Sequence, residues 1–106
     1  MKIVNRIKKS PEFALTIKEG KCHKNDAFTI HLKQSDVPCR VGISVSTKIG
    51  NAVVRNRIKR QVRAMCDELI DYSNEHSDLV IVVRKQFLEN NYATNKQFLK
   101  ELITHR

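Results

Sequence analysis

The chain has 106 residues, a length that suits one domain built around a single hydrophobic core. It carries 20 Lys and Arg against 11 Asp and Glu, and the resulting net charge of +9 indicates an anionic partner such as a nucleic acid. We expect neither a membrane span nor a secretory signal, because no long apolar run is found. The three cysteines, Cys22, Cys39 and Cys66, are far apart and odd in number, which suits reduced thiols in a cytoplasm.

The first predicted helix follows a basic N-terminal cluster of Lys2, Arg6, Lys8 and Lys9. Residues 10–12, Ser-Pro-Glu, combine an N-cap, a proline at the first helical position and an acid in the first turn. We expect this helix to end near Glu19, because a glycine follows. Phe13 and Ile17 share one of its faces, and the simplest interpretation of Phe13 is a core residue.

Two segments, 27–32 and 40–46, alternate between apolar and polar residues, as half-buried strands do. A turn around Val37 and Pro38 predicts that they form an antiparallel pair. Their second face then presents only small or polar side chains, namely Thr29, His31, Gly42, Ser44 and Ser46. Such a face could hold an extended chain, but any half-solvated sheet also presents a polar face. Both interpretations stay open.

The segment 48–63, KIGNAVVRNRIKRQVR, holds six cations and no acid. At 100° per residue, an apolar stripe runs along one side of this helix. Its members are Val54, Ile58 and Val62 of the segment, followed by Met65 and Leu69. The opposite half carries Asn56, Arg57, Arg60 and Arg63, while Lys59 lies on a flank. Asn51 is a good N-cap, so we expect the helix to begin near Ala52. A solvated basic face is the alternative, although such faces normally mix charges of both signs.

The remaining chain predicts a buried strand and a last helix. Residues 79–83 are apolar throughout and, apart from Leu79, β-branched, which is typical of a central strand buried on both faces. Asn91 is expected to cap a helix whose inner stripe is Phe98, Leu99, Leu102 and Ile103. The order helix, strand, strand, helix, strand, helix predicts an α+β two-layer sandwich of αββαβα type over residues 1–106, in which one short strand could be missing.

Catalytic groups are not apparent in the sequence. Cleavage of a phosphodiester by a protein needs clustered carboxylates that hold metal ions, or paired histidines. Asp67, Glu68 and Asp71 look like ordinary surface positions, and the four histidines lack the spacing of metal ligands. We therefore predict no catalytic residue and no metal site in the protein itself.

The segment GNAVVRNRIKRQVR, residues 50–63, together with the preceding RVGISVSTK, resembles the signature of the bacterial ribonuclease P protein component. The segments 5–13 and 78–84 also resemble parts of that family, so nearly the whole chain is covered. The resemblance implies a fold like the second domain of a small-subunit ribosomal protein, with a left-handed crossover through the basic helix.

The resemblance also implies a function. In that family the RNA subunit, with magnesium, removes the 5′ leader of precursor tRNA, and the protein binds both RNAs. The residues implied to bind the catalytic RNA are Arg55, Asn56, Arg57, Lys59, Arg60 and Arg63. The residues implied to line a trough for the leader are Phe13, Thr29, His31, Ser44 and Lys48. Ile17 stands where the family commonly has a second aromatic, and His31 where one aromatic is common. No cofactor held by the protein alone is implied.

There are two alternative classes of function. A ribosome-associated or general binder of structured RNA could use the same charge and the same sheet without any specificity for a leader. A DNA-binding module would need a helix-turn-helix or a dimer motif, and neither is apparent. Sequencing the RNA that the protein captures from a lysate separates the first of these from ribonuclease P.

Overall fold

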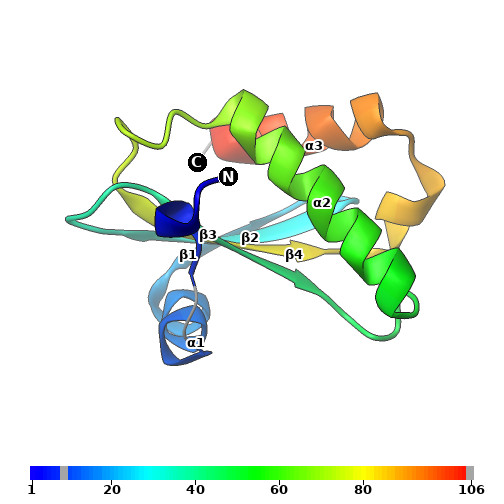
Figure 1. Cartoon of the computed structure of the whole chain (residues 1–106), viewed down its shortest axis with the longest axis horizontal. Helices are drawn as coiled ribbons and strands as arrows, with labels where there is room; N and C mark the ends of the chain where they lie inside the picture. The colour runs from blue at the N-terminus through cyan, green and yellow to red at the C-terminus, as the bar shows by residue number, and fades with distance from the viewer. Residues whose placement is uncertain (8–9, 105–106) are drawn as a thin grey trace.

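The computed structural model describes residues 1–7 and 10–104, so Lys8 and Lys9 of the basic N-terminal cluster lie outside the described residues. The helices are α1 (Ser10–Glu19), α2 (Ala52–Leu69) and α3 (Tyr92–Thr104), with short 3₁₀ turns η1 (Ile3–Asn5) and η2 (Lys85–Glu89). The strands are β1 (Lys21–Lys24), β2 (Phe28–Gln34), β3 (Arg40–Val45) and β4 (Ser77–Val83) (Figure 1).

The four strands form one sheet in the order β1-β2-β4-β3. β2 is antiparallel to both β1 and β4, whereas β3 is parallel to β4. The predicted pairing of the segments 27–32 and 40–46 is therefore wrong, because β4 lies between them. β4 is the most apolar strand, and the central position buries both of its faces. The short strand β1 is the one that the sequence pattern did not reveal.

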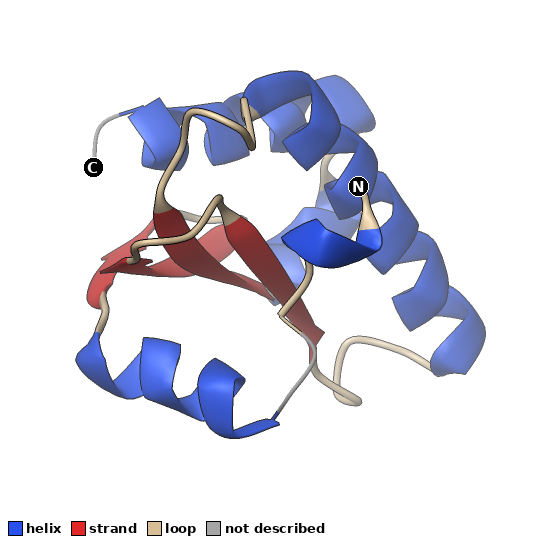
Figure 2. Cartoon of the chain, turned by 60° about the vertical axis from the view of Figure 1, so that its left-hand side comes forward, coloured by secondary structure: helices blue, strands red, loops and turns tan. Residues whose placement is uncertain are grey.

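Helices lie on both sides of this sheet (Figure 2). α2 and α3 cover one face and enclose the main core, while α1 lies against the opposite face. The core residues that the strands supply are mainly Phe28, Ile30, Val41, Val45, Leu79, Ile81 and Val83. Those that the covering helices supply are Ile58, Val62, Met65, Cys66, Leu99 and Leu102. The predicted α+β class is confirmed, and so is the inner stripe of both long helices.

Local capping signals locate the helix starts as expected. Asn51 caps α2, because its Oδ1 accepts a hydrogen bond of 3.0 Å from the backbone N–H of Val54. Asn91 does the same for α3, accepting from the N–H of Thr94 at 2.8 Å. α1 has the predicted bounds, but the residue that it buries is Thr16, and Phe13 is only half-buried. α2 joins the parallel strands β3 and β4, and the left-handed sense of this crossover stays a prediction.

The three cysteines are thiols that form no disulfide in the described part of the chain. Cys22 is exposed, whereas Cys39 and Cys66 belong to the core. Burial raises the pKa of the Cys66 thiol to about 12, so this group stays protonated at neutral pH. Among residues 1–7 and 10–104, no helix has both the length and the apolar character that crossing a bilayer requires.

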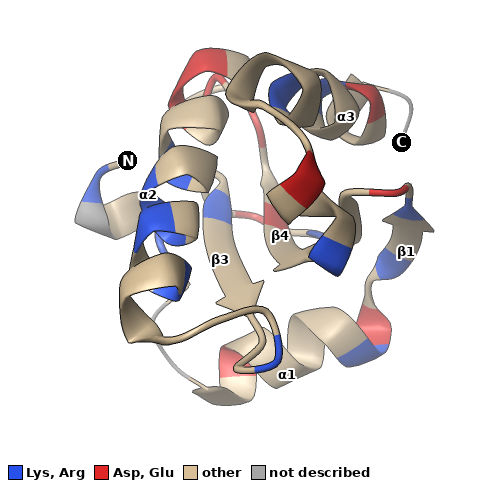
Figure 3. Ribbon diagram, turned by 90° about the vertical axis from the view of Figure 1, so that its right-hand side faces the viewer, with Lys and Arg blue, Asp and Glu red and all other residues tan. Residues whose placement is uncertain are grey.

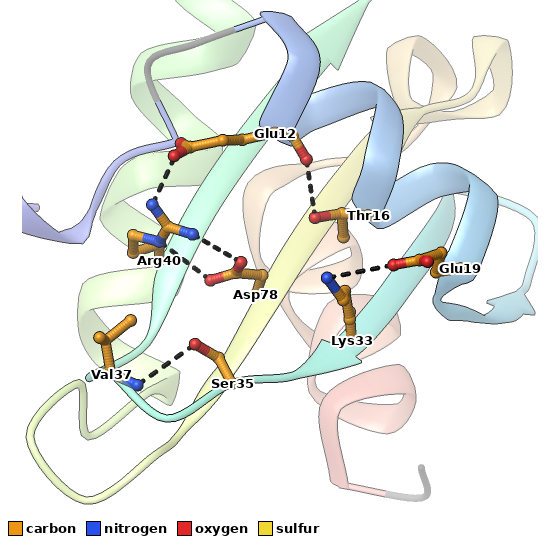
Figure 4. Close-up of polar contacts among 8 residues, drawn as sticks. All are labelled: Glu12, Thr16, Glu19, Lys33, Ser35, Val37, Arg40 and Asp78. Carbon is orange, nitrogen blue, oxygen red and sulfur yellow. Dashed lines mark hydrogen bonds and ion pairs between the residues drawn. The ribbon is translucent and has the colours of Figure 1, made fainter.

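Charged side chains attach α1 to the sheet (Figure 4). Arg40 of β3 binds Asp78 of β4 through two hydrogen bonds of 3.1 and 2.8 Å, and it also reaches Glu12 of α1 at 3.1 Å. The hydrogen bonding to Asp78 is the main reason why the pKa of Arg40 is raised. Lys33 adds an ion pair of 3.2 Å with Glu19 at the other end of α1. Since the Asp78 side chain is only 9% exposed, its pair with Arg40 is the strongest of these links.

We predict that Asp78→Asn lowers the free energy of unfolding by roughly 1.5–3 kcal/mol, because it removes a charged, nearly buried hydrogen-bond acceptor. Glu12→Gln is the matched control, since that carboxylate is 39% exposed. Its removal should cost no more than about 1 kcal/mol. Urea denaturation of both variants provides the measurement. Equal losses of stability would show that the pair within the sheet is no stronger than the pair with α1.

Candidate RNA-binding surfaces

The outer side of α2 carries a set of basic and amide residues, which we call the basic front (Arg55, Asn56, Arg57, Lys59, Arg60 and Arg63). In Figure 3 the Lys and Arg segments follow one another along this helix, and acidic residues begin only toward its C-terminal end. Asn56, Arg57 and Arg60 are exposed, and the other three members are half-buried. The helical periodicity that buries Ile58 and Val62 forces these cations outward.

No cation of the basic front forms an ion pair with any residue among 1–7 and 10–104. Three cations elsewhere in the described chain, Arg40, Lys33 and Lys96, are held in ion pairs. Five cations within nine residues repel one another, and polyphosphate is a partner that removes this cost. The basic front therefore has the electrostatic character of a nucleic-acid contact.

The residues of the basic front lie on different sides of α2. Four of its residues share an open hollow of about 490 Å³, which is lined by Val53, Asn56, Lys59, Arg60 and Arg63. Arg57 lies instead on the side that faces η2, beside Gln61 and Leu88. Arg55 is also outside the hollow, and its buried Nε has no hydrogen-bond partner among the described residues. The structure thus brings four of the six predicted residues together.

The second candidate surface is the sheet face beneath α1. A side chain at Gly42 would point at the Phe13 ring, so this glycine faces α1. The strand register then places three rows of side chains on the same face. Thr29, Val82 and Ser44 form the first row, and His31, Val80 and Gly42 form the second. The third row contains Lys33, Asp78 and Arg40, which the ion pairs with α1 occupy.

The first row is the open part of this face, and we call it the open row (Thr29, Val82 and Ser44). All three residues are half-buried, whereas Val80 and Gly42 in the next row are buried beneath α1. One cation lies beside the row in the sheet, and another follows β3 in the chain. Lys24 of β1 lies opposite Thr29 in the sheet, and Lys48 follows the end of β3.

The predicted leader residues lie on or beside the open row. Thr29 and Ser44 are in it, but Val82 of β4 separates them, because the two strands are not neighbours. His31 is half-buried in the second row, and its Nδ1 has no hydrogen-bond partner within the described chain. Lys48 is exposed in a tight turn, where its backbone N–H donates to Ser46 Oγ at 3.1 Å.

Three residues of this surface were not predicted as part of the trough. Lys24 belongs to the short strand β1, whose four residues give too little alternation to be recognised. Val82 was expected in a central strand, but its place in the open row depends on how β4 pairs. Of these three residues, only Gly42 could have been predicted from the sequence, because glycine inside a strand often marks a close approach of another group. Here that group is the Phe13 ring.

The acidic residues near the end of α2 have structural partners. Asp67 accepts hydrogen bonds from the Met1 amine at 2.6 Å and from the Tyr72 hydroxyl at 2.9 Å. Burial would raise the pKa of Asp67, but these two hydrogen bonds, together with the positive charges of the Met1 amine and Arg6, lower the pKa. Asp71 accepts from the Asn74 side chain at 2.6 Å. Across residues 1–7 and 10–104, no group of three or more His, Cys, Asp or Glu could hold a metal ion.

We predict that Gly42→Ala disturbs the Phe13 ring. An added Cβ would lie 2.8 Å from Phe13 Cδ2 and would overlap Cε2, so the ring would have to move. The free energy of unfolding should fall by roughly 1–3 kcal/mol, as in other overpacked sites. In a Phe13→Ala background the same change should cost much less, because the obstructing ring is absent. A double-mutant cycle by urea denaturation measures this coupling, and purely additive effects would contradict the contact.

Comparison with known proteins points to one family. The family model described as Ribonuclease P matches residues 1–106. A ribonuclease P protein component of Bacillus cereus (strain G9842) is 45% identical over 101 residues, which cover 93% of this chain and 88% of the relative. One from Bacillus anthracis (strain CDC 684 / NRRL 3495) is 44% identical over 101 residues, covering 93% and 85%.

Solved structures give the same result. The Staphylococcus aureus RNase P protein has a TM-score of 0.84 and 28% identity, covering 95% of this chain and 94% of the other. The Thermotoga maritima RNase P protein has a TM-score of 0.82 and 28% identity, with 95% and 96% covered. The match to the family model and the identity to these relatives extend over nearly the whole chain. This chain therefore belongs to the ribonuclease P protein family.

Proposed function

We propose that this protein binds the ribonuclease P RNA through the basic front and the 5′ leader of precursor tRNA through the open row. As a ribonuclease P protein component, it is a subunit of an endoribonuclease whose partner is the ribonuclease P RNA. The observation that carries the proposal is the set of α2 cations without an ion-pair partner among the described residues. Several other surface cations of the same chain are held in ion pairs.

The basic front suits a structured RNA. Its cations project from one rigid helix, so several phosphates can be contacted without a large loss of side-chain freedom on binding. Arg60 and Arg63 can each form two parallel hydrogen bonds with one phosphate. Asn56, in the same hollow, offers both a donor and an acceptor.

The open row suits a single strand. Thr29 and Ser44 supply hydroxyl groups, Val82 supplies an apolar floor, and the half-buried Phe13 ring stands above the adjoining row. A base can stack on an aromatic ring while cations contact the backbone, which is how proteins hold single-stranded nucleic acids. Lys24, which lies beside Thr29, and Lys48, which follows β3, are suited to contact that backbone. The trough proposed for the leader is therefore Phe13, Thr29, His31, Ser44 and Lys48 with these additions.

Hydrolysis is assigned to the RNA subunit. Magnesium would be held by that RNA and by the substrate, and it would polarise the scissile phosphate there. The protein's own residues would position the two RNAs and neutralise phosphate charge. Cleavage of precursor tRNA by the protein without the RNA subunit would contradict this assignment.

We predict that Arg57→Gln with Arg60→Gln weakens binding of the ribonuclease P RNA and flattens its salt dependence. For each phosphate contact that the substitutions remove, the slope of log K against log salt concentration should fall by about 0.7–0.9. Filter binding over a range of salt concentrations measures the slope. Lys100→Gln on the exposed side of α3 is the matched control and should leave it unchanged. A slope equal to that of the parent protein, in a folded variant, would mean that the basic front is only solvated.

We also predict that Phe13→Ala with Lys48→Ala lowers the preference of the assembled complex for precursor over mature tRNA. Stacking contributes about 1–3 kcal/mol per base, so the ratio of the two affinities should fall by roughly five-fold or more. Affinity for the ribonuclease P RNA and for mature tRNA should stay within about two-fold, since neither requires the open row. An unchanged ratio would place the leader elsewhere, as a general binder of structured RNA would allow.

A further inference from the structure

A small cleft lies between α2 and η2. Contacts between the basic front and RNA phosphates would not require such a cleft. Its volume is about 210 Å³, and its lining residues are Arg57, Ile58, Gln61, Phe87, Leu88 and Asn90. This volume is below the roughly 300–1,000 Å³ of pockets that hold whole small molecules. The cleft is therefore of a size for one ring system rather than for a cofactor.

The floor of the cleft is rigid and apolar. Phe87 is buried and meets Phe28 of the core edge to face, with ring centroids 5.6 Å apart. Ile58 beside it is also buried. Leu88, in contrast, is 45% exposed although it lies within this apolar wall. An exposed leucine backed by core aromatic packing is a flat apolar contact that a planar group could cover.

The side-chain amide of Asn90 at the cleft has a fixed orientation. The carbonyl oxygen of Phe87 can only accept, so it fixes the Asn95 side chain, whose Nδ2 donates to it at 3.0 Å. The remaining Asn95 Oδ1 accepts from Asn90 Nδ2 at 3.0 Å. Within the described chain, this leaves Asn90 Oδ1 as an acceptor with no partner. Gln61, on the α2 side, adds a second amide with both donors and an acceptor.

Arg57 supplies the charge. Its side chain is exposed, it lines the cleft, and it forms no ion pair with a residue in the described part of the chain. None of the described acidic residues lines the cleft. One nucleotide offers a phosphate, a planar base and a hydrogen-bonding base edge. The guanidinium, the apolar wall and the two amides of this cleft match these three parts.

We propose that this cleft binds one unpaired nucleotide of the ribonuclease P RNA. The base packs against Leu88, an exocyclic amino group donates to Asn90 Oδ1, Gln61 contacts the base edge, and Arg57 holds the phosphate. An amino group is present in adenine, cytosine and guanine but not in uracil. The inference rests on the proposed function, because it assigns the occupant to the RNA that the basic front binds. The proposed function assigns the leader to the sheet face beneath α1, whereas the residues that line this cleft belong to α2, η2 and Asn90.

Leu88→Ser and Gln61→Ala test the cleft without removing a cation. Each should weaken binding of the ribonuclease P RNA by roughly three- to tenfold, because it removes an apolar contact or a base-edge hydrogen bond. The salt slope should be unchanged, since every phosphate contact remains. The matched controls are Leu15→Ser, at a leucine on α1 that is 42% exposed, and Gln97→Ala on α3, and both should bind like the parent protein. Circular dichroism confirms that each variant is folded, and if Leu88→Ser unfolds, Gln61→Ala carries the test.

Chemical probing of the RNA gives a second readout. One unpaired adenine, cytosine or guanine that the parent protein protects should become reactive in the complex with Leu88→Ser. Affinity equal to that of the parent in both variants, or equal losses of affinity in the controls, overturns the inference. A protected uracil that responds to Leu88→Ser also overturns it. These outcomes are independent of the Arg57 and Arg60 salt slope, so the cleft can be disproved while the basic front stands.

Discussion

The position of β4 between β2 and β3 is the constraint on which the rest of this structure depends. Its residues face both sides of the sheet, with Leu79, Ile81 and Val83 in the core beneath α2 and α3. Val80 and Val82 face the side of α1. Because β3 and β4 are parallel neighbours, the chain between them must cross one face of the sheet, and α2 is that crossover. The same pairing leaves Val82 at the centre of the open row.

Some charged side chains stabilise the fold, whereas those of the basic front have no partner within the described chain. Arg40 pairs with both Glu12 and Asp78, and its pair with Glu12 holds α1 on the sheet. The cations of the basic front have no such partners among the described residues, although they repel one another. Repulsion among these cations reduces the stability of the free protein, and the proposed binding of RNA would remove that cost. The two proposed RNA surfaces differ accordingly, since one is dominated by charge and the other by packing.

Local patterns in the sequence predicted the local structure well. The caps at Asn51 and Asn91, the apolar stripe of α2 and the buried character of β4 each depend on residues close together in the chain. The pairing of β2 with β3 failed because a turn predicts only that two strands can be neighbours. It does not reveal that a more apolar strand, much later in the chain, competes for the same edge.

The candidate site shows the same limit. Helical periodicity correctly turned Arg57 and Arg60 outward, but it could not show that η2 approaches one side of α2. The separation of Arg57 from the hollow of Arg60 and Arg63 is a tertiary property. Thr29 and Ser44 were correctly placed on one face by alternation, yet their separation by Val82 required the strand order. The sequence thus predicts which face of its helix or strand a residue lies on, but it does not predict which residues of other elements lie beside it.

The assignment of two RNAs to two surfaces can be tested directly by hydroxyl-radical cleavage from a tethered iron chelate. Thr29→Cys places the chelate in the open row and Asn56→Cys places it on the basic front, each in a Cys22→Ser background. The native Cys39 and Cys66 are fully buried and should not react with the reagent. In the assembled complex, the probe at residue 29 should cleave the leader of precursor tRNA, and the probe at residue 56 should cleave the ribonuclease P RNA. Cleavage of the same RNA positions from both sites, or an uncut leader with the probe at residue 29, would contradict the assignment.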